Sequence, residues 1–383
     1  MKGASDVPLL KIAVKLVGEQ GSVDLERFDF APFQSAGSES LGTLRLYKTG
    51  TSETFSTKEH YASINPAEGS SFAGSVRYSA PGTYYFFLAA SVSTKAPAGG
   101  KITVSPRSIT VSGEEVKLTE PPTTDYELQA GLHGDFTIGT ESGAHFKTIS
   151  EAIEALKTRG VDGPVRLRLS PGHYTEPLLL PAIPGLSLTN PLVIEPTTGR
   201  LGDVTLENKQ YKKALYGDDK PGYFTLDGAD YVTLRALSFL TTKSEAPALL
   251  LIRNASQRIT IDGCSFTAPK TTQYNEGDLA LIKTNRGEEA YPNNDHLTLT
   301  RSKLTGGYIG VHMDGLSNVA LPNQQGLTIE GNTFSSQGSK GIYVRCVSDV
   351  VIRSNEIQAE GTASYDYHAL DLTLGDGITA QAN

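Results

Sequence analysis

Five segments of similar pattern recur between residues 232 and 357, and no other feature restricts the fold of this chain as strongly. Each segment alternates apolar and polar residues, passes through a polar turn and ends on an apolar residue at the same offset. The segments are VTLRALSF (Val232–Phe239), ITIDGCSF (Ile259–Phe266), LTLTRSKL (Leu297–Leu304), LTIEGNTF (Leu327–Phe334) and VVIRSNEI (Val350–Ile357). Units of this size cannot bury their own apolar face, so they must stack on one another. The strands are short, the period is too short for a propeller blade and no helical pattern recurs. The repeat therefore predicts a right-handed parallel β-helix.

A second series of short strands lies upstream of these segments and supports the same stacking. The strands are YFTLD (Tyr223–Asp227), LLLIR (Leu249–Arg253), LALIK (Leu279–Lys283), YIGVH (Tyr308–His312), GIYVR (Gly341–Arg345) and ALDLT (Ala369–Thr373). Period-two alternation places one column inside, made of Leu226, Ile252, Ile282, Val311, Val344 and Leu372. The residues one step later form an outward column of Asp227, Arg253, Lys283, His312, Arg345 and Thr373. A turn column reads Leu237, Cys264, Ser302, Asn332 and Asn355, and its last two members predict a short asparagine ladder.

Composition argues against several classes of protein. The formal net charge is −8 over 383 residues, and general nucleic-acid binding requires a basic face. No apolar run is long enough to span a membrane. The start, MKGASDVPLL, lacks the apolar core of a signal peptide, so the protein is either cytosolic or begins after a removed signal. Two cysteines, Cys264 and Cys346, are too few for a disulfide framework or a metal cluster, and we expect free buried thiols.

The chain is expected to contain two domains. Residues 1–118 hold alternating strands separated by Gly, Ser and Pro turns, which is typical of an antiparallel β-sandwich. Residues 119–126 form a Pro- and Thr-rich linker, and residues 127–383 form the β-helix. Apolar residues at helical spacing predict an amphipathic helix over 148–159 that covers the open end of the first coil. The sequence ends at GDGITAQAN inside an apparent coil, so we expect the natural protein to continue.

Two stretches resemble known protein families. GDFTIGTESGAHFKTISEAIEALKTRG, followed by PVRLRLSPGHYTEPLLL, resembles the opening of β-helix proteins of the pectin-lyase-like superfamily, and the resemblance extends over residues 135–383. It is closest in style to large surface proteins of bacteria that use the type IX secretion pathway. LRLYKTGTSETFST and GTYYFFLAASVSTKAPAGGKI resemble the β-sandwich module that precedes some secreted sialidases. Together these resemblances imply an exported, extracellular or cell-surface protein without its C-terminal sorting domain. They imply a fold and a cellular location. They imply no activity, because a fold alone does not fix an activity.

The resemblance implies three possible catalytic patterns, and the sequence shows none of them at matching coil positions. Calcium-dependent lyases of the superfamily stack Asp or Glu on adjacent coils, because a hard cation needs many oxygen ligands. Polygalacturonases need a carboxylate trio, and pectin methylesterases need an Asp pair with Arg and Gln. Here the outward column contributes one acid, Asp227, followed by bases. We therefore expect no cofactor, because a calcium site would need an acidic ladder.

The basic part of the outward column is the main candidate for ligand binding. It consists of Arg253, Lys283, His312 and Arg345. Stacked about 4.8 Å apart from coil to coil, these cations would repel one another, and an extended polyanion such as a uronan or a sulfated glycan would offset that repulsion. Tyr343, beside Arg345, would stack on a sugar ring. The alternative is that acids near the column pair with it. Those acids are Asp314, Asp371, Glu288 and Glu289.

Two smaller polar clusters are further candidates. His312 and Asp314 in GVHMDG, with Tyr308 nearby, would supply an acid, a base and an orienting group. His368 and Asp371 in YDYHALD would hold a cation or tune a general base. For each cluster an ordinary polar turn or loop is the favoured explanation.

Three functions remain open from the sequence. The leading one is an exported bacterial surface protein whose β-helix binds a glycan or another extracellular polymer, as an adhesin does. Its partners would be extracellular polysaccharide or a host or biofilm surface polymer, together with the secretion machinery. The second is a polysaccharide lyase or glycoside hydrolase, in which Lys283 or Arg345 neutralises a uronate and His312 or Tyr343 acts as the base. The third is a structural stalk without a ligand.

Overall fold

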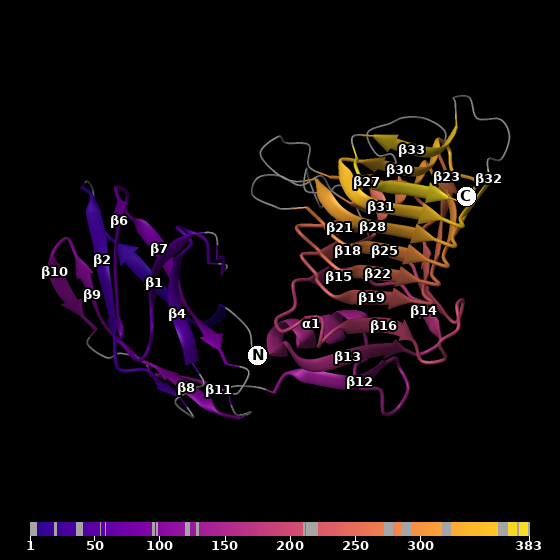
Figure 1. Cartoon of the computed structure of the whole chain (residues 1–383). Helices are drawn as coiled ribbons and strands as arrows, with labels where there is room; N and C mark the ends of the chain where they lie inside the picture. The colour runs from indigo at the N-terminus through magenta and orange to yellow at the C-terminus, as the bar shows by residue number, and fades with distance from the viewer. Residues whose placement is uncertain are drawn as a thin grey trace. The chain divides into compact units, whose positions relative to one another are not determined.

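A computed structural model of the chain divides into two compact units, residues 1–132 with 158–162 and residues 133–157 with 163–383. The structure describes residues 6–18, 21–35, 41–53, 55–57, 59–93, 96, 99–118, 123–127, 130–209, 211, 221–271, 279–284, 293–315, 323–358, 367–373 and 375–381. Strands dominate both units, and the described ranges contain one α-helix (Figure 1).

The first unit is an antiparallel β-sandwich, as predicted. Its first sheet has the order β1 (Val7–Leu16), β7 (Gly82–Val92), β4 (Leu41–Lys48), β5 (His60–Ile64). The second has the order β10 (Glu114–Lys117), β9 (Pro106–Val111), β2 (Val23–Phe30), β6 (Ser71–Tyr78). A third, small sheet has the order β11 (Thr124–Glu127), β8 (Lys101–Val104), β3 (Gln34–Ser35). Side chains from both larger sheets meet in one core, where Phe28 and Leu88 are fully buried.

The segment expected to be a linker contains a strand. β11 covers Thr124–Glu127 and pairs with β8 in antiparallel register, Tyr126 opposite Ile102. The Thr residues that suggested an extended linker suit a β-strand equally well, since both conformations are extended. The first unit therefore reaches to Leu132 rather than to residue 118.

The second unit is a right-handed parallel β-helix, as the repeat predicts, and it is built from three sheets that run along the stack (Figure 1). Sheet 1 consists of β12 (Leu132–Ile138), β13 (Val161–Leu169), β16 (Leu192–Pro196), β19 (Val232–Arg235), β22 (Ile259–Asp262), β25 (Leu297–Thr300), β28 (Gln324–Glu330), β31 (Val347–Arg353) and β34 (Ile378–Gln381). Sheet 2 consists of β14 (Gly172–Tyr174), β17 (Val204–Leu206), β20 (Ser238–Leu240), β23 (Ser265–Lys270), β26 (Lys303–Gly307), β29 (Thr333–Ser335) and β32 (Glu356–Gln358). Sheet 3 consists of β15 (Leu178–Pro181), β18 (Phe224–Asp227), β21 (Ala248–Arg253), β24 (Ala280–Thr284), β27 (Ile309–Asp314), β30 (Lys340–Arg345) and β33 (His368–Thr373).

The five aligned segments stack in the predicted register. In sheet 1 Ile259 pairs with Leu297, and Leu297 pairs with Leu327. In sheet 2 Phe239 pairs with Phe266, and their rings stack with centroids 4.8 Å apart in the core. Each segment therefore supplies one strand to sheet 1 and one to sheet 2, with the polar turn between them.

The turn column forms the expected ladder. Asn332 accepts a hydrogen bond from the Ser302 backbone N–H at 2.9 Å and donates to the Asn355 Oδ1 at 2.9 Å. Cys264 lies in the same column, and both it and Cys346 are free and buried, as expected. Burial raises the pKa of the Cys264 thiol to about 12, so this thiol is protonated and unreactive.

The predicted capping helix is present as α1 (Ile149–Arg159). Its buried residues are the four expected ones, Ile149, Ala152, Ile153 and Leu156. The helix begins where the Thr148 Oγ1 accepts the Glu151 backbone N–H at 3.0 Å, an N-cap bond. The apolar side of α1, at the first coils of the β-helix, is therefore the buried side of this helix.

Candidate functional site

The four cations of the predicted outward column do not form one ladder. Lys283 pairs with Leu251 on one side and with His312 on the other, so Arg253 lies two residues further along its strand than Lys283 does. His312 pairs with Tyr343, whereas Arg345 pairs with Asp314. The expectation of a single basic ladder is therefore wrong, and the cations are divided between two columns.

The first column runs through four consecutive coils of sheet 3, at the β spacing of about 4.8 Å. In order along the stack it contains Lys283, His312, Tyr343 and Asp371. The second column contains Asp227 and Arg253, then Asp314, Arg345 and Thr373 after one coil whose residue lies outside the described ranges. Arg253, Lys283, His312, Tyr343 and Arg345 alternate with buried residues, as the predicted outward direction requires, but their neighbours differ from those predicted.

Acids pair with most of the cations in these two columns. The Arg253 guanidinium donates to Asp227 at 2.9 Å, and Arg345 donates to Asp314 at 2.9 Å. The alternative weighed from the sequence, ion pairing within the face, therefore describes Arg253 and Arg345. Glu288 and Glu289, the other acids considered there, lie outside the described residues.

His312 is surrounded by cations from neighbouring coils. Burial lowers the pKa of this imidazole to about 3, and the charges of Lys283, Lys340 and Arg345 act in the same direction. The ring meets the Tyr343 ring edge to face, with centroids 4.9 Å apart. At neutral pH the imidazole is therefore uncharged. It pairs with the Tyr343 ring in the positive potential of the neighbouring cations.

Lys340 completes this cluster, although the sequence did not single it out. Its ammonium lies 4.2 Å from the centre of the Tyr343 ring and forms an ion pair with Asp371. Alternation would place Lys340 on the same side as the buried Ile342, so the pattern hides it. Lys340 is the first residue of β30, where alternation fixes the direction of a side chain least strictly. This position was the one indication in the sequence that Lys340 could turn toward the outer face.

The second predicted cluster is divided. Asp371 belongs to the first column, but His368 is exposed at the first residue of β33, opposite Lys340. Tyr365 of the YDYHALD segment and most of the long segments 270–279 and 285–296 lie outside the described residues.

We name the group Lys283, His312, Lys340, Tyr343 and Asp371, with the Asp314–Arg345 pair, the sheet 3 cluster.

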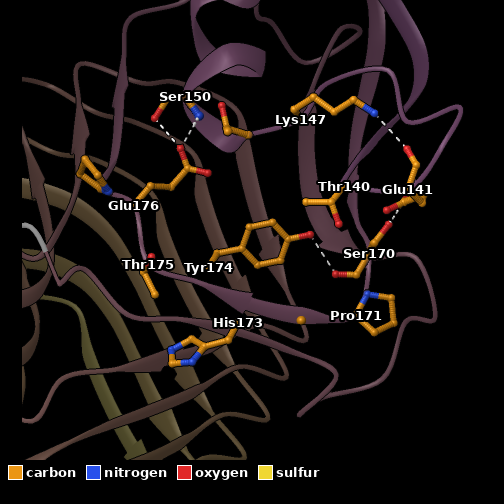
Figure 2. Close-up of a pocket in the computed structure, with 14 residues that line it drawn as sticks. Thr140, Glu141, Lys147, Ser150, Ser170, Pro171, His173, Tyr174, Thr175 and Glu176 are labelled. Atoms are coloured by element: carbon orange, nitrogen blue, oxygen red, sulfur yellow. Dashed lines mark hydrogen bonds between the residues drawn. The ribbon is translucent and has the colours of Figure 1, made fainter.

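A separate hollow of about 740 Å³ lies beside the first turn of α1 (Figure 2). Its wall includes Glu141, Lys147, His173, Tyr174 and Glu176. None of these residues was predicted as functional from the sequence. The segment GHYTEP was expected only to contribute to the first strands of the β-helix. Two carboxylates in one hollow resemble the acid and base of glycoside hydrolysis.

The polar groups of this hollow are occupied by structural bonds. The Glu176 carboxylate accepts the backbone N–H groups of Ile149 and Ser150 at 2.8 and 3.0 Å, so it caps α1. The Ser170 hydroxyl donates to Glu141 and lowers the pKa of that carboxyl. A general acid needs a raised pKa, so Glu141 does not suit that role, and both oxygens of Glu176 are taken up in capping α1. The sheet 3 cluster is the better candidate site.

Within the described ranges, no three His, Cys, Asp or Glu side chains gather closely enough to hold a metal ion. The absence of a cofactor stays a prediction. The described ranges also contain no helix that is long and apolar enough to cross a membrane.

Comparisons with known proteins find only distant structural similarities. No known family and no curated protein matches the sequence. Among solved structures, Escherichia coli YbhC is 12% identical over 69% of this chain and 89% of its own, with a TM-score of 0.40. A pectin methylesterase from Aspergillus niger is 14% identical over 66% of this chain and 91% of its own, with a TM-score of 0.35. The catalytic domain of a GH87 alpha-1,3-glucanase is 11% identical over 97% of this chain and 54% of its own, with a TM-score of 0.30.

Proposed function

We propose that the sheet 3 cluster binds an extended glycan that carries acidic groups, and that the protein is a binding protein rather than an enzyme. The observation behind this is that Lys283 from β24, and Lys340 and Arg345 from β30, lie on the two coils that flank His312 in β27, where the imidazole pairs with the Tyr343 ring. An extended polymer could contact side chains from these successive coils together. Sugar rings pack on aromatic faces, and paired charges still offer donors and acceptors to hydroxyl groups.

The pKa of His312 favours binding over lyase chemistry. A general base works best when its pKa lies near the operating pH. An imidazole whose pKa is about 3 is uncharged at neutral pH but holds a proton too weakly to remove one from a sugar carbon. His312 therefore suits a neutral contact surface, and the acidic preference comes from Lys283, Lys340 and Arg345.

Retention by a panel of immobilised glycans tests this proposal. The panel contains uronans, sulfated glycans and neutral glucans, and elution is followed with salt. We expect the acidic members to retain the protein, and Tyr343→Ala and Lys283→Ala to weaken retention by about tenfold. Lys303→Ala, which removes an exposed lysine from sheet 2, is the matched control and should change nothing. Equal retention of all four proteins, or none by any glycan, would refute the proposal.

Turnover is measured on the same panel. Unsaturated products or new reducing ends that disappear in the His312→Gln variant would assign the cluster to a lyase or hydrolase instead. A protein with neither retention nor turnover would be a stalk.

We infer further that the protein is exported and acts at the cell surface or outside the cell. The support is the resemblance of residues 135–383 to exported surface β-helix proteins and the extended polymer that the cluster suits. Proteolysis of intact cells tests this: a surface protein is cleaved by an added protease, whereas an intracellular one is protected.

A further inference from the structure

The outer face of sheet 1 carries two columns of side chains with an unusual symmetry. The first column, in coil order, is Val193, Thr233, Thr260, Thr298, Thr328 and Val351. Over these six coils it reads the same in both directions, with threonines in the middle and valines outside them, whereas one coil further Arg166 adjoins Val193 and Thr379 adjoins Val351. The centre of this symmetry lies between the coil of Thr260 and the coil of Thr298.

The second column is charged, and it is complementary to its own reverse about the same centre. In coil order it is Glu195, Arg235, Asp262, Thr300, Glu330 and Arg353. When this order is reversed, Glu195 meets Arg353 and Arg235 meets Glu330. Asp262 then meets Thr300, beside which lies the exposed guanidinium of Arg301. No like charges face each other in this arrangement.

From these two columns we propose that the outer face of sheet 1 is the interface of a two-fold symmetric dimer of this chain. The axis would run parallel to the strands, between β22 and β25. Such an axis reverses the coil order of the second copy while keeping each column opposite itself, which is what an isologous contact requires. Each copy would then place Arg235 against Glu330 of the other, and Arg353 opposite the largely buried Glu195.

The charges of this face are already balanced within one chain, which lowers the cost of covering them. Arg235 lies 3.3 Å from Glu195 and 3.5 Å from Asp262, and Arg353 lies 3.0 Å from Glu330. Three of the side chains that would face the second copy remain accessible: Arg235 is 42%, Glu330 37% and Arg353 52% exposed, whereas Glu195 is only 9% exposed and is held by its own chain's arginines. An arginine has enough donors to hold a second carboxylate while keeping the first.

The size of the face predicts a weak dimer. Six coils at about 4.8 Å and four residues per strand at about 3.3 Å give a flat area of roughly 30 by 13 Å. The two copies would together bury somewhat less than the roughly 1,000 Å² of a stable interface. Dimerisation should therefore appear only at high protein concentration, and salt should oppose it because the contacts across the interface are charged.

Sedimentation velocity over a wide concentration range tests the proposal on the full chain. We expect a monomer at low micromolar concentration and a dimer that grows toward millimolar concentration at low salt. Arg235→Glu places like charges opposite Glu330, and Glu330→Arg does so opposite Arg235, so each variant alone should raise the dissociation constant by about tenfold or more. Lys303→Glu, which reverses a charge on sheet 2, is the control and should dimerise normally.

Mixing the two variants separates a direct contact from damage to the fold. In the mixed dimer Glu at position 235 of one chain faces Arg at position 330 of the other, and the native pair forms on the second side. We expect the mixture to dimerise about as tightly as the unaltered chain. A chain that stays monomeric at every concentration, a dimer unaffected by both variants, or a mixture no tighter than its components would overturn the proposal. A foreign partner on this face would leave the chain monomeric.

Discussion

The outer faces of sheet 1 and sheet 3 belong to the same coils, but they distribute charge differently. On sheet 1, acids and bases alternate along one column, so each arginine has a carboxylate above or below it. On sheet 3, three cations converge on one buried imidazole, and the acids that pair with two of them lie to the side. The alternating face balances its own charge, whereas the convergent face holds a strongly perturbed group. Perturbed groups cluster at functional sites, which directs attention to sheet 3.

The largest expected difference between the faces is in their response to acid. Burial holds the folded-state pKa of His312 at about 3, below the ordinary value of 6.5. As the pH falls from about 6.5 to 3, the unfolded chain therefore binds this proton before the folded chain does, and the free energy of unfolding decreases. The shift corresponds to a loss of about 4 kcal/mol. Urea unfolding at several pH values measures it.

The variant His312→Gln isolates this contribution, because every other group titrates as before. We expect its stability to fall less steeply between pH 6.5 and 3 than that of the unaltered chain. Thr298→Gln, an uncharged change on the outer face of sheet 1, should keep the original slope. Identical slopes for all three proteins would mean that the pKa of His312 is the same in the folded and the unfolded chain.

A smaller difference concerns threonine, which serves opposite purposes in the two sheets. Thr284 in sheet 3 is fully buried, and its hydroxyl accepts the Asp314 backbone N–H at 3.0 Å. Thr298 in sheet 1 lies on the outer face. We expect Thr284→Val to cost about 1–2 kcal/mol, because the N–H loses its partner, and Thr298→Val to change stability little. Thermal unfolding at low protein concentration measures both, and a neutral Thr284→Val would show that water satisfies the N–H.

The two sheets also differ in how far the sequence determines them. In the five coils from β19 to β32 the residue at the turn between sheets 1 and 2 adopts a positive φ, between 51° and 66°, and this turn has constant length. The residues are Ala236, Gly263, Arg301, Gly331 and Ser354. Because this turn couples the two strands, one alignment fixes the register of both sheets. Sheet 3 is reached through connections of different lengths, so no shared turn fixes its register.

That difference explains why the face of each candidate was predicted but its neighbours were not. A shift of one residue would have moved every side chain to the other face, whereas a shift of two leaves alternation unchanged. Ile282 and Val311 are buried as expected, yet Ile282 stacks on Leu250 rather than on Ile252. The buried hydroxyl of Thr284 occupies the place below Ile252. An apolar pattern cannot anticipate a polar residue in the core, so the basic ladder was drawn two residues out of register.

The smallest expected effect compares one ion pair from each face. Arg345 and Asp314 on sheet 3 are about one-third and one-fifth exposed, whereas Arg353 and Glu330 on sheet 1 are largely open to solvent. Replacing Arg345 by Gln leaves a partly buried carboxylate without its cation, so we expect a loss of about 1 kcal/mol. Arg353→Gln removes an exposed pair and should cost less than about 0.5 kcal/mol.

Added salt should erase the loss of stability in Arg353→Gln but only reduce the loss in Arg345→Gln, because partly buried charges are screened less. Chemical unfolding at two ionic strengths distinguishes the pairs. If both variants lost the same stability and responded equally to salt, the two faces would not differ electrostatically, and the argument for a site on sheet 3 would lose its basis.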